Sequence, residues 1–248
     1  MLLNCDLGES YGAWKMPVDS AIMALIDQAN IACGFHAGDP VALKHAIALA
    51  ARHRVMIGAH PSYPDLQGFG RRSMAMPHDE LVACLEYQIS ALSGLASLYQ
   101  QSLSYVKPHG ALYNDMMQSE NVRDAVFQAV SGIGGGTLKI MVQAHPAYQS
   151  ITDHAKTYDL AVIFEAFADR HYEADGYLMS RHKAGAVLDE AGAVRQAEQI
   201  IHDSRIVACD GTVLTMPIDT LCVHGDTQGA VQMASAIRRL IDENGTQQ

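Results

Sequence analysis

Residues able to transfer protons, stabilise anions or bind metal ions recur in this sequence directly after short apolar segments, beside glycine or proline. If those segments are parallel strands, their carboxyl ends lie on one face, where α/β proteins bind ligands. We therefore expect one active site assembled from seven segments. These are Asn4–Glu9, Asn30–Asp39, His60–Arg72, Lys107–Gly110, His145–Pro146, Glu165–Arg170 and His224–Asp226.

Five residues of this set are the catalytic candidates: Asp6, Glu9, His60, Lys107 and His109. A carboxylate beside a histidine suits proton transfer near neutral pH, which predicts that Asp6 or Glu9 acts with His60 on a water molecule. Lys107 and His109 are expected to stabilise developing negative charge.

A divalent metal ion could be held between separate strand ends, by Asp6, His36 and His60. Nothing in the spacing requires such an ion, because the chain has no H-E-x-x-H motif or other close histidine pair on one helix.

The remaining polar residues are predicted to bind the substrate. Arg71 and Arg72 follow Gly-Phe-Gly, and each guanidinium offers a fork of donors that fits a carboxylate or phosphate, although a solvated pair is an alternative. Asp39 precedes Pro40 and is better explained as a helix cap than as a catalyst. The substrate-binding candidates are Asn30, His36, Arg71, Arg72, Glu165, Arg170, His224 and Asp226, the last of which could equally cap the final helix.

Short apolar runs alternate with helical periodicity along the chain, which is typical of repeated βα units. The clearest helix is predicted over 79–101, with an apolar stripe at intervals of three and four. Asp210-Gly211 predicts a tight hairpin between Ile206–Cys209 and Thr212–Leu214. We expect one barrel domain over residues 1–248, with a flexible tail over 243–248, while an open doubly wound sheet remains the alternative.

Composition narrows the class of protein. The 248 residues are 49% hydrophobic and 18% charged, and 17 basic against 27 acidic side chains give a net charge of −10, which argues against nucleic-acid binding. The five cysteines are scattered and odd in number, which favours reduced thiols in the cytoplasm. The sequence also shows no signal sequence and no membrane-spanning run, so we expect a cytoplasmic protein that does not enter membranes. The chain lacks both the G-x-x-x-x-G-K-[ST] loop, which binds nucleotide phosphates, and the G-x-S-x-G motif, which carries the nucleophile of many serine hydrolases.

Several of these segments, taken together, resemble the successive signatures of the LamB/YcsF family. They run in order from residue 4 to about 240, and the eleven-residue segment Ala29–Asp39 is the most specific. Leu178-Met179-Ser180-Arg181 departs from the expected Leu-Val-Pro-Arg but keeps the arginine. The resemblance implies a (β/α)7-type barrel related to the glycoside hydrolase/deacetylase fold.

The same resemblance implies an activity: ATP-dependent hydrolysis of the lactam of 5-oxo-L-proline (pyroglutamate) to L-glutamate. The chain would be the A component of a 5-oxoprolinase that also contains subunits B and C, and ATP with Mg²⁺ would serve the full complex. Two other functions stay open. One is a self-sufficient metal-dependent amidohydrolase or deacetylase of the same fold, and the other is a non-catalytic scaffold whose polar rim docks other subunits.

Overall fold

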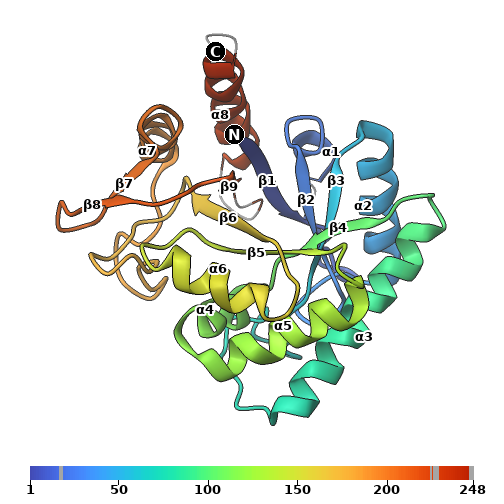
Figure 1. Cartoon of the computed structure of the whole chain (residues 1–248). Coiled ribbons are helices and arrows are strands. Elements are labelled where there is room, and N and C mark those ends of the chain that lie inside the picture. The colour runs from blue at the N-terminus through green and yellow to red at the C-terminus, as the bar shows by residue number, and fades with distance from the viewer. Residues whose placement is uncertain (17–18, 224, 226–228, 246–248) are drawn as a thin grey trace.

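Seven parallel strands close into a barrel that helices surround (Figure 1). The computed structural model describes residues 1–16, 19–223, 225 and 229–245. The barrel strands, in spatial order, are β1 (Leu2–Leu7), β2 (Gln28–Ala32), β3 (Met56–His60), β4 (Leu103–Val106), β5 (Lys139–Gln143), β6 (Val162–Phe167) and β9 (Thr220–Val223). β9 pairs with both β6 and β1, so the sheet has no free edge. The predicted barrel is confirmed, and the open doubly wound sheet is excluded.

The helices take up the connections between the strands. They are α1 (Asp19–Ile22), α2 (Pro40–His53), α3 (His78–Ser97), α4 (Gly110–Gln118), α5 (Glu120–Gly134), α6 (Tyr148–Lys156), α7 (Glu190–Asp203) and α8 (Ala230–Gly245). Asp39 caps α2 as predicted, since its Oδ1 accepts hydrogen bonds from the amides of Val41 and Ala42. In the described part of the chain, no helix is long and apolar enough to cross a membrane.

The strands turn two different faces to their surroundings. Leu3, Cys5 and Leu7 of β1 alternate with Asn4 and Asp6, and the apolar set belongs to the hydrophobic core between strands and helices. Ile57 and Ala59 of β3 also belong to this hydrophobic core. The opposite face of several strands points into the barrel, where Asn4, Asp6, Asn30 and Glu165 are buried polar side chains, and this interior positions the site.

Some predicted boundaries were wrong. α3 ends at Ser97 rather than 101, and α4 and α6 were not predicted, because each is only nine residues long and follows a strand after a brief turn. The hairpin is confirmed as β7 (Arg205–Val207) and β8 (Val213–Thr215), which pair antiparallel outside the barrel. α8 continues to Gly245, so residues 243–245 of the predicted tail are helical. Residues 246–248 lie outside the described part.

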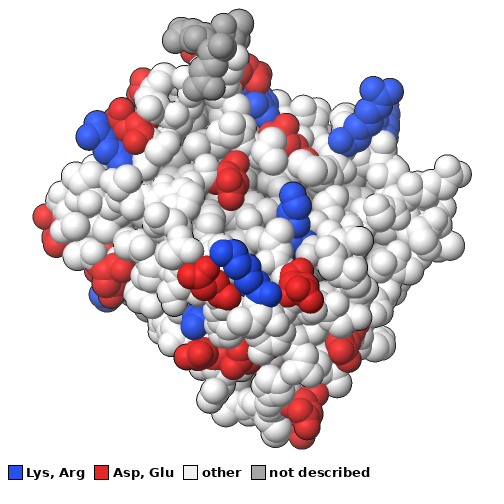
Figure 2. All heavy atoms as spheres, viewed as in Figure 1, with Lys and Arg blue, Asp and Glu red and all other residues white. Residues whose placement is uncertain are grey.

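Charged side chains are interspersed over the face of the molecule in Figure 2. Among the described residues visible there, Lys and Arg stand singly or next to Asp and Glu, without an extended basic area. This distribution accords with the net charge of −10 and offers no continuous surface for a nucleic-acid backbone on that face.

Candidate active site

One buried layer of polar side chains crosses the barrel from β1 to β4. The strand register places Asp6 beside Asn30, Asn30 beside Gly58, and Gly58 beside Tyr105. Asn30 donates through Nδ2 to Asp6 Oδ1 at 2.8 Å, and the Tyr105 hydroxyl donates to Asn30 Oδ1 at 2.6 Å. Gly58 is required here, because a Cβ at that position would lie 2.1 Å from the Tyr105 ring. These contacts hold one oxygen of Asp6 in place.

Lys107 lies at the centre of this layer and is almost fully buried. Its Nζ lies 2.9 Å from Asp6 Oδ1 and 2.7 Å from Glu165 Oε1. Burial would lower the pKa of the ammonium, but Asp6, Cys222 and Glu165 outweigh burial and hold that pKa well above its ordinary value. The Tyr113 hydroxyl donates to the other oxygen of Glu165 at 2.8 Å. Lys107 is therefore a permanent cation between two buried carboxylates.

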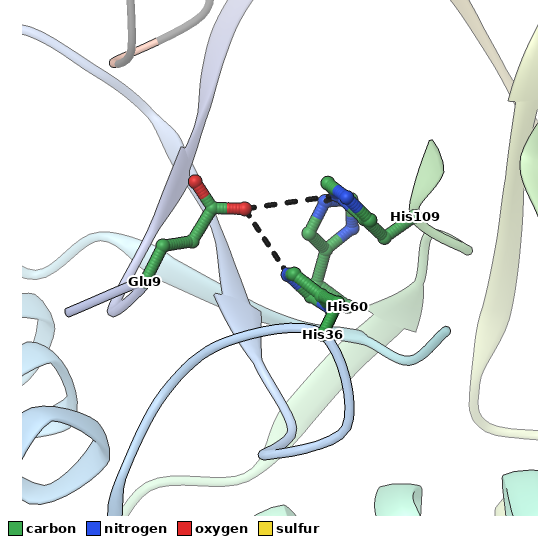
Figure 3. A group of neighbouring side chains, drawn as sticks. All are labelled: Glu9, His36, His60 and His109. Carbon is green, nitrogen blue, oxygen red and sulfur yellow. Dashed lines mark hydrogen bonds and ion pairs between the residues drawn. The ribbon is translucent and has the colours of Figure 1, made fainter. Parts of the chain in front are cut away.

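Three histidines and Glu9 form a second group beside this layer (Figure 3). The rings of His36 and His109 stack with centroids 3.7 Å apart, and His36 Nε2 lies 3.1 Å from Glu9 Oε1. His60 Nε2 lies 3.0 Å from His109 Nδ1 and 3.4 Å from Asp6 Oδ2. Burial, reinforced by the neighbouring imidazoles, lowers the pKa of His36 and of His109 well below the ordinary value. Both rings are neutral at pH 7.

A cavity of about 350 Å³ opens above these two groups. Asp6, His60, Lys107 and His109 form part of its wall, and Arg71, Arg170 and Arg181 form another part. Arg170 is buried and donates to the carbonyls of Met179 and Ala186, which ties down the segment that carries Arg181. Burial, and next the charge of Arg181, lower the pKa of Arg170 to about 10. A cavity that combines fixed polar groups with cations is suited to a small anionic ligand.

The structure brings most of the predicted site residues together. Those in or beside the two buried groups are Asp6, Glu9, Asn30, His36, His60, Lys107, His109 and Glu165. Arg71 and Arg170 line the cavity. Arg72 does not: its guanidinium binds the Asp65 carboxylate through Nε and Nη2 and lies away from the cavity wall. His224 and Asp226 fall outside the described residues.

Several residues of the site were not predicted. Asn4, Tyr105 and Cys222 complete the hydrogen bonding around Lys107 and Asn30, Tyr113 donates to Glu165, and Arg181 lines the cavity. A signal for part of this set exists in the sequence. Polar residues two apart at the carboxyl end of a strand, such as Asn4 with Asp6 and Tyr105 with Lys107, share one face and mark a polar interior.

A closed parallel barrel with proton-transferring side chains under a cavity at the carboxyl ends of its strands is the architecture of a barrel enzyme. Within that class, the model of the "LamB/YcsF family" matches residues 1–248, and the chain belongs to this family.

Individual relatives match over nearly the whole chain. The 5-oxoprolinase A component of Vibrio cholerae is 50% identical over 242 residues, which are 97% of this chain and 97% of that protein. A Pseudomonas putida relative, also a 5-oxoprolinase A component, is 46% identical and covers 98% of this chain and 94% of its own. The crystal structure of a "Lactam Utilization Protein" from Thermus thermophilus superposes with a TM-score of 0.89 at 38% identity, over 99% and 97% of the two chains.

Proposed function

We propose that this chain is the A component of an ATP-dependent 5-oxoprolinase, a hydrolase that opens the lactam of 5-oxo-L-proline to give L-glutamate together with subunits B and C. The observation that carries the proposal is the 50% identity, across 97% of both chains, to a protein of that name. The buried Asp6–Lys107–Glu165 cluster beneath the cavity supports a catalytic role for this chain rather than a scaffold role. We further propose one domain and a cytoplasmic location.

The chemistry explains why ATP is needed. Resonance makes the lactam amide a poor electrophile, and a phosphoryl group transferred to its oxygen removes that protection. Water can then add to the ring carbon, after which the ring C–N bond breaks as nitrogen gains a proton, and an acyl phosphate remains. A second water releases phosphate and completes glutamate. ATP with Mg²⁺ would act on the full complex, at a site shared with the partners, because this chain has no G-x-x-x-x-G-K-[ST] loop.

We assign the activation of water to Asp6, beside which His60 lies. Lys107 and Asn30 hold Oδ1 of Asp6, while Oδ2 lies 3.4 Å from His60 Nε2, and both side chains line the cavity. His60 Nδ1 lies 2.7 Å from the carbonyl oxygen of Lys107, which orients the ring. The Lys107 ammonium would stabilise the negative charge that develops on the substrate oxygen.

Arg71 and Arg181 are the proposed anion holders of the cavity. Arg71 lies over the Phe69 ring, 4.9 Å from its centroid, and is exposed on the side of the cavity. A guanidinium pairs well with a carboxylate or a phosphoryl group, and the substrate carries one and acquires the other. The sequence allowed either Arg71 or Arg72 to bind the substrate anion. Because Arg72 is bound to Asp65, we assign this role to Arg71.

The test is glutamate release from 5-oxoproline with ATP and Mg²⁺, comparing the chain alone with the chain plus subunits B and C. Activity is expected only in the mixture. Asp6→Asn should reduce the turnover number at least about 100-fold, which is the scale of a lost general base, while co-purification with the partners is retained. Full turnover by a complex that contains Asp6→Asn would refute the catalytic assignment.

A second function is favoured by one observation, the cluster of Glu9, His36, His60 and His109. It suits a self-sufficient metal-dependent amidohydrolase or deacetylase. That alternative predicts hydrolysis by the chain alone, without ATP, and the same assay separates the two.

A further inference from the structure

Glu9, His36, His60 and His109 meet at one point although they come from four separate parts of the chain (Figure 3). His60 is the last residue of β3, and His109 precedes α4 directly after β4. Glu9 and His36 lie in the connections that follow β1 and β2. One potential ligand atom from each residue lies within 4.8 Å of all the others, and all four residues are buried.

The hydrogen bonds of two of these rings determine where their protons lie. His60 Nδ1 is 2.7 Å from the carbonyl oxygen of Lys107, and His109 Nε2 is 2.8 Å from the carbonyl oxygen of Phe69. A carbonyl oxygen only accepts, so Nδ1 of His60 and Nε2 of His109 carry the hydrogens. In the neutral rings the lone pairs therefore sit on His60 Nε2 and His109 Nδ1.

Those two nitrogen atoms face each other at 3.0 Å. Two lone pairs at that distance repel, whereas a cation next to both would turn the repulsion into attraction. Negative charge for such a cation is at hand, because Glu9 Oε1 lies 3.7 Å from His109 Nδ1 and 3.1 Å from His36 Nε2. Ligands at about 2.05 Å around a tetrahedral ion are roughly 3.3 Å apart, which is close to these separations.

The ring nitrogens that point away from the cluster also make the hydrogen bonds typical of metal-binding histidines. A histidine that binds a metal usually donates its other N–H to a carbonyl or carboxylate, which orients the ring. His60 and His109 both do this through backbone carbonyls. His36 is the exception, since its Nδ1 is buried and has no partner among the described residues.

We propose that Glu9, His36, His60 and His109 bind one divalent transition-metal ion, of which Zn²⁺ fits the donors best. Three imidazole nitrogens and one carboxylate oxygen suit zinc, whereas Mg²⁺ prefers oxygen donors. The site is thus separate from any Mg²⁺ that accompanies ATP. When bound, such an ion supplies Lewis-acid polarisation of a water or carbonyl oxygen at the cavity wall.

This ligand set differs from the one that the sequence suggested, which was Asp6, His36 and His60. Asp6 Oδ1 is engaged by Asn30 and by the Lys107 ammonium at 2.9 Å. A cation so close to Asp6 makes it a poor ligand for a second cation. Glu9 and His109 take its place.

The test uses the whole chain by itself, without ATP or partners, so its result does not depend on the proposed function. The metal-free protein, prepared with a chelator, is titrated with Zn²⁺ by calorimetry, and Co²⁺ is added to a second sample to record its visible absorption. We expect one ion per chain, a Co²⁺ spectrum of four-coordinate type, and no displacement of Zn²⁺ by millimolar Mg²⁺.

Variants assign the ligands. His60→Ala and His109→Ala should each weaken Zn²⁺ binding by more than about 100-fold, because losing a ligand exceeds the 10- to 100-fold effect of losing its outer partner. His36→Ala should weaken Zn²⁺ binding the least of the three variants, since His36 lacks an outer hydrogen-bond partner among the described residues. His145→Ala is the matched control, a buried histidine after β5 that lies outside the cluster, and it should bind Zn²⁺ as the parent does.

Circular dichroism of each metal-free variant checks that it folds. Binding of far less than one equivalent of Zn²⁺ to the folded parent chain would overturn the proposal. So would unchanged affinity in folded His60→Ala and His109→Ala, or equal loss in His145→Ala. If the ligand variants fail to fold, the stoichiometry and Co²⁺ spectrum of the parent chain decide the matter alone.

Discussion

Two walls of the same cavity are built in opposite ways. The histidine wall, which comprises Asp6, His60, Lys107 and His109, is buried and comes from β1, β3 and β4 or the residues directly after them. The arginine wall, which comprises Arg71, Arg170 and Arg181, lies on longer connections, and Arg71 is exposed. One wall is anchored in the barrel itself, and the other is carried by loops.

The difference suggests a division of labour. Side chains held by several buried hydrogen bonds keep one geometry, which proton transfer and metal binding require. The exposed guanidinium of Arg71 can adjust to a ligand, which suits the capture of an anion, whereas Arg170 is held by the carbonyls of Met179 and Ala186. We therefore expect changes in the histidine wall to affect turnover, metal binding and stability, and changes in the arginine wall to affect substrate affinity.

The largest effect is expected at Lys107. Lys107→Met would leave the carboxylates of Asp6 and Glu165 buried without their cation, and breaking a buried ion pair costs about 3–5 kcal/mol. Urea unfolding of the chain measures this loss. Adding Glu165→Gln to the variant should restore part of the stability, because one uncompensated charge disappears.

Lys183→Met is the control for that experiment. Lys183 pairs with Glu173 on the surface, 2.7 Å away, so its removal should leave the free energy of unfolding unchanged within error. Equal losses in the two lysine variants would mean that the buried cluster is not held together by Lys107.

On the arginine wall, Arg71→Ala should raise KM for 5-oxoproline about 10- to 100-fold, since a hydrogen bond to a charged group contributes about 1.5–3 kcal/mol. The turnover number should change far less. Steady-state kinetics of the assembled complex separates the two parameters. Arg72→Ala should leave KM near the parent value, because Arg72 is bound to Asp65 and does not line the cavity. The reverse order of effects would reassign the anion site to Arg72.

Gly70 connects the two walls, and its replacement tests how closely they are coupled. A Cβ at Gly70 would lie 2.8 Å from His109 Cδ2 and 2.8 Å from His36 Cβ, whereas one at Gly12 would meet nothing within 4 Å. Both glycines have positive φ, 64° and 55°, so alanine strains the backbone similarly at each.

Gly70→Ala should therefore lose about 1–3 kcal/mol more stability than Gly12→Ala, the typical cost of overpacking. It should also weaken Zn²⁺ binding while Gly12→Ala does not. Chemical denaturation and calorimetry give the two readouts. Identical behaviour of the two variants would show that the 68–72 loop adjusts without moving the histidines.

The histidine wall could be predicted from the sequence better than the arginine wall, because strand ends follow from local pattern and loop contacts do not. A polar residue at the end of a strand lies on the carboxyl face of any parallel barrel, so Asp6, His60 and Lys107 could be placed from local pattern alone. The partner of Arg72 could not, because the Asp65 contact depends on the path of an irregular loop. The position of Arg181 depends likewise on buried contacts of Arg170.

Local signals also account for the elements that were predicted. The Asp39 cap and the Asp210-Gly211 hairpin each depend on a few adjacent residues. The metal-ligand group was only half anticipated, since choosing Glu9 over Asp6 requires knowing that Lys107 occupies the space beside Asp6. That is information about tertiary contacts, and strand spacing does not contain it.

The smallest predicted effect concerns the pair outside the cavity, Arg72 with Asp65. Hydrogen bonding from Arg72 holds the pKa of the Asp65 carboxyl below its ordinary value. A lowered pKa in the folded state means that the pair contributes stability above the unfolded-state pKa of about 3.9, and that this contribution disappears as the pH falls through the folded-state value. Parent and Arg72→Ala chains should therefore differ slightly in urea midpoint at pH 7 and converge in acid. A difference that stays constant across that range would mean that Arg72 stabilises its loop by packing and not by the charge of its pair with Asp65.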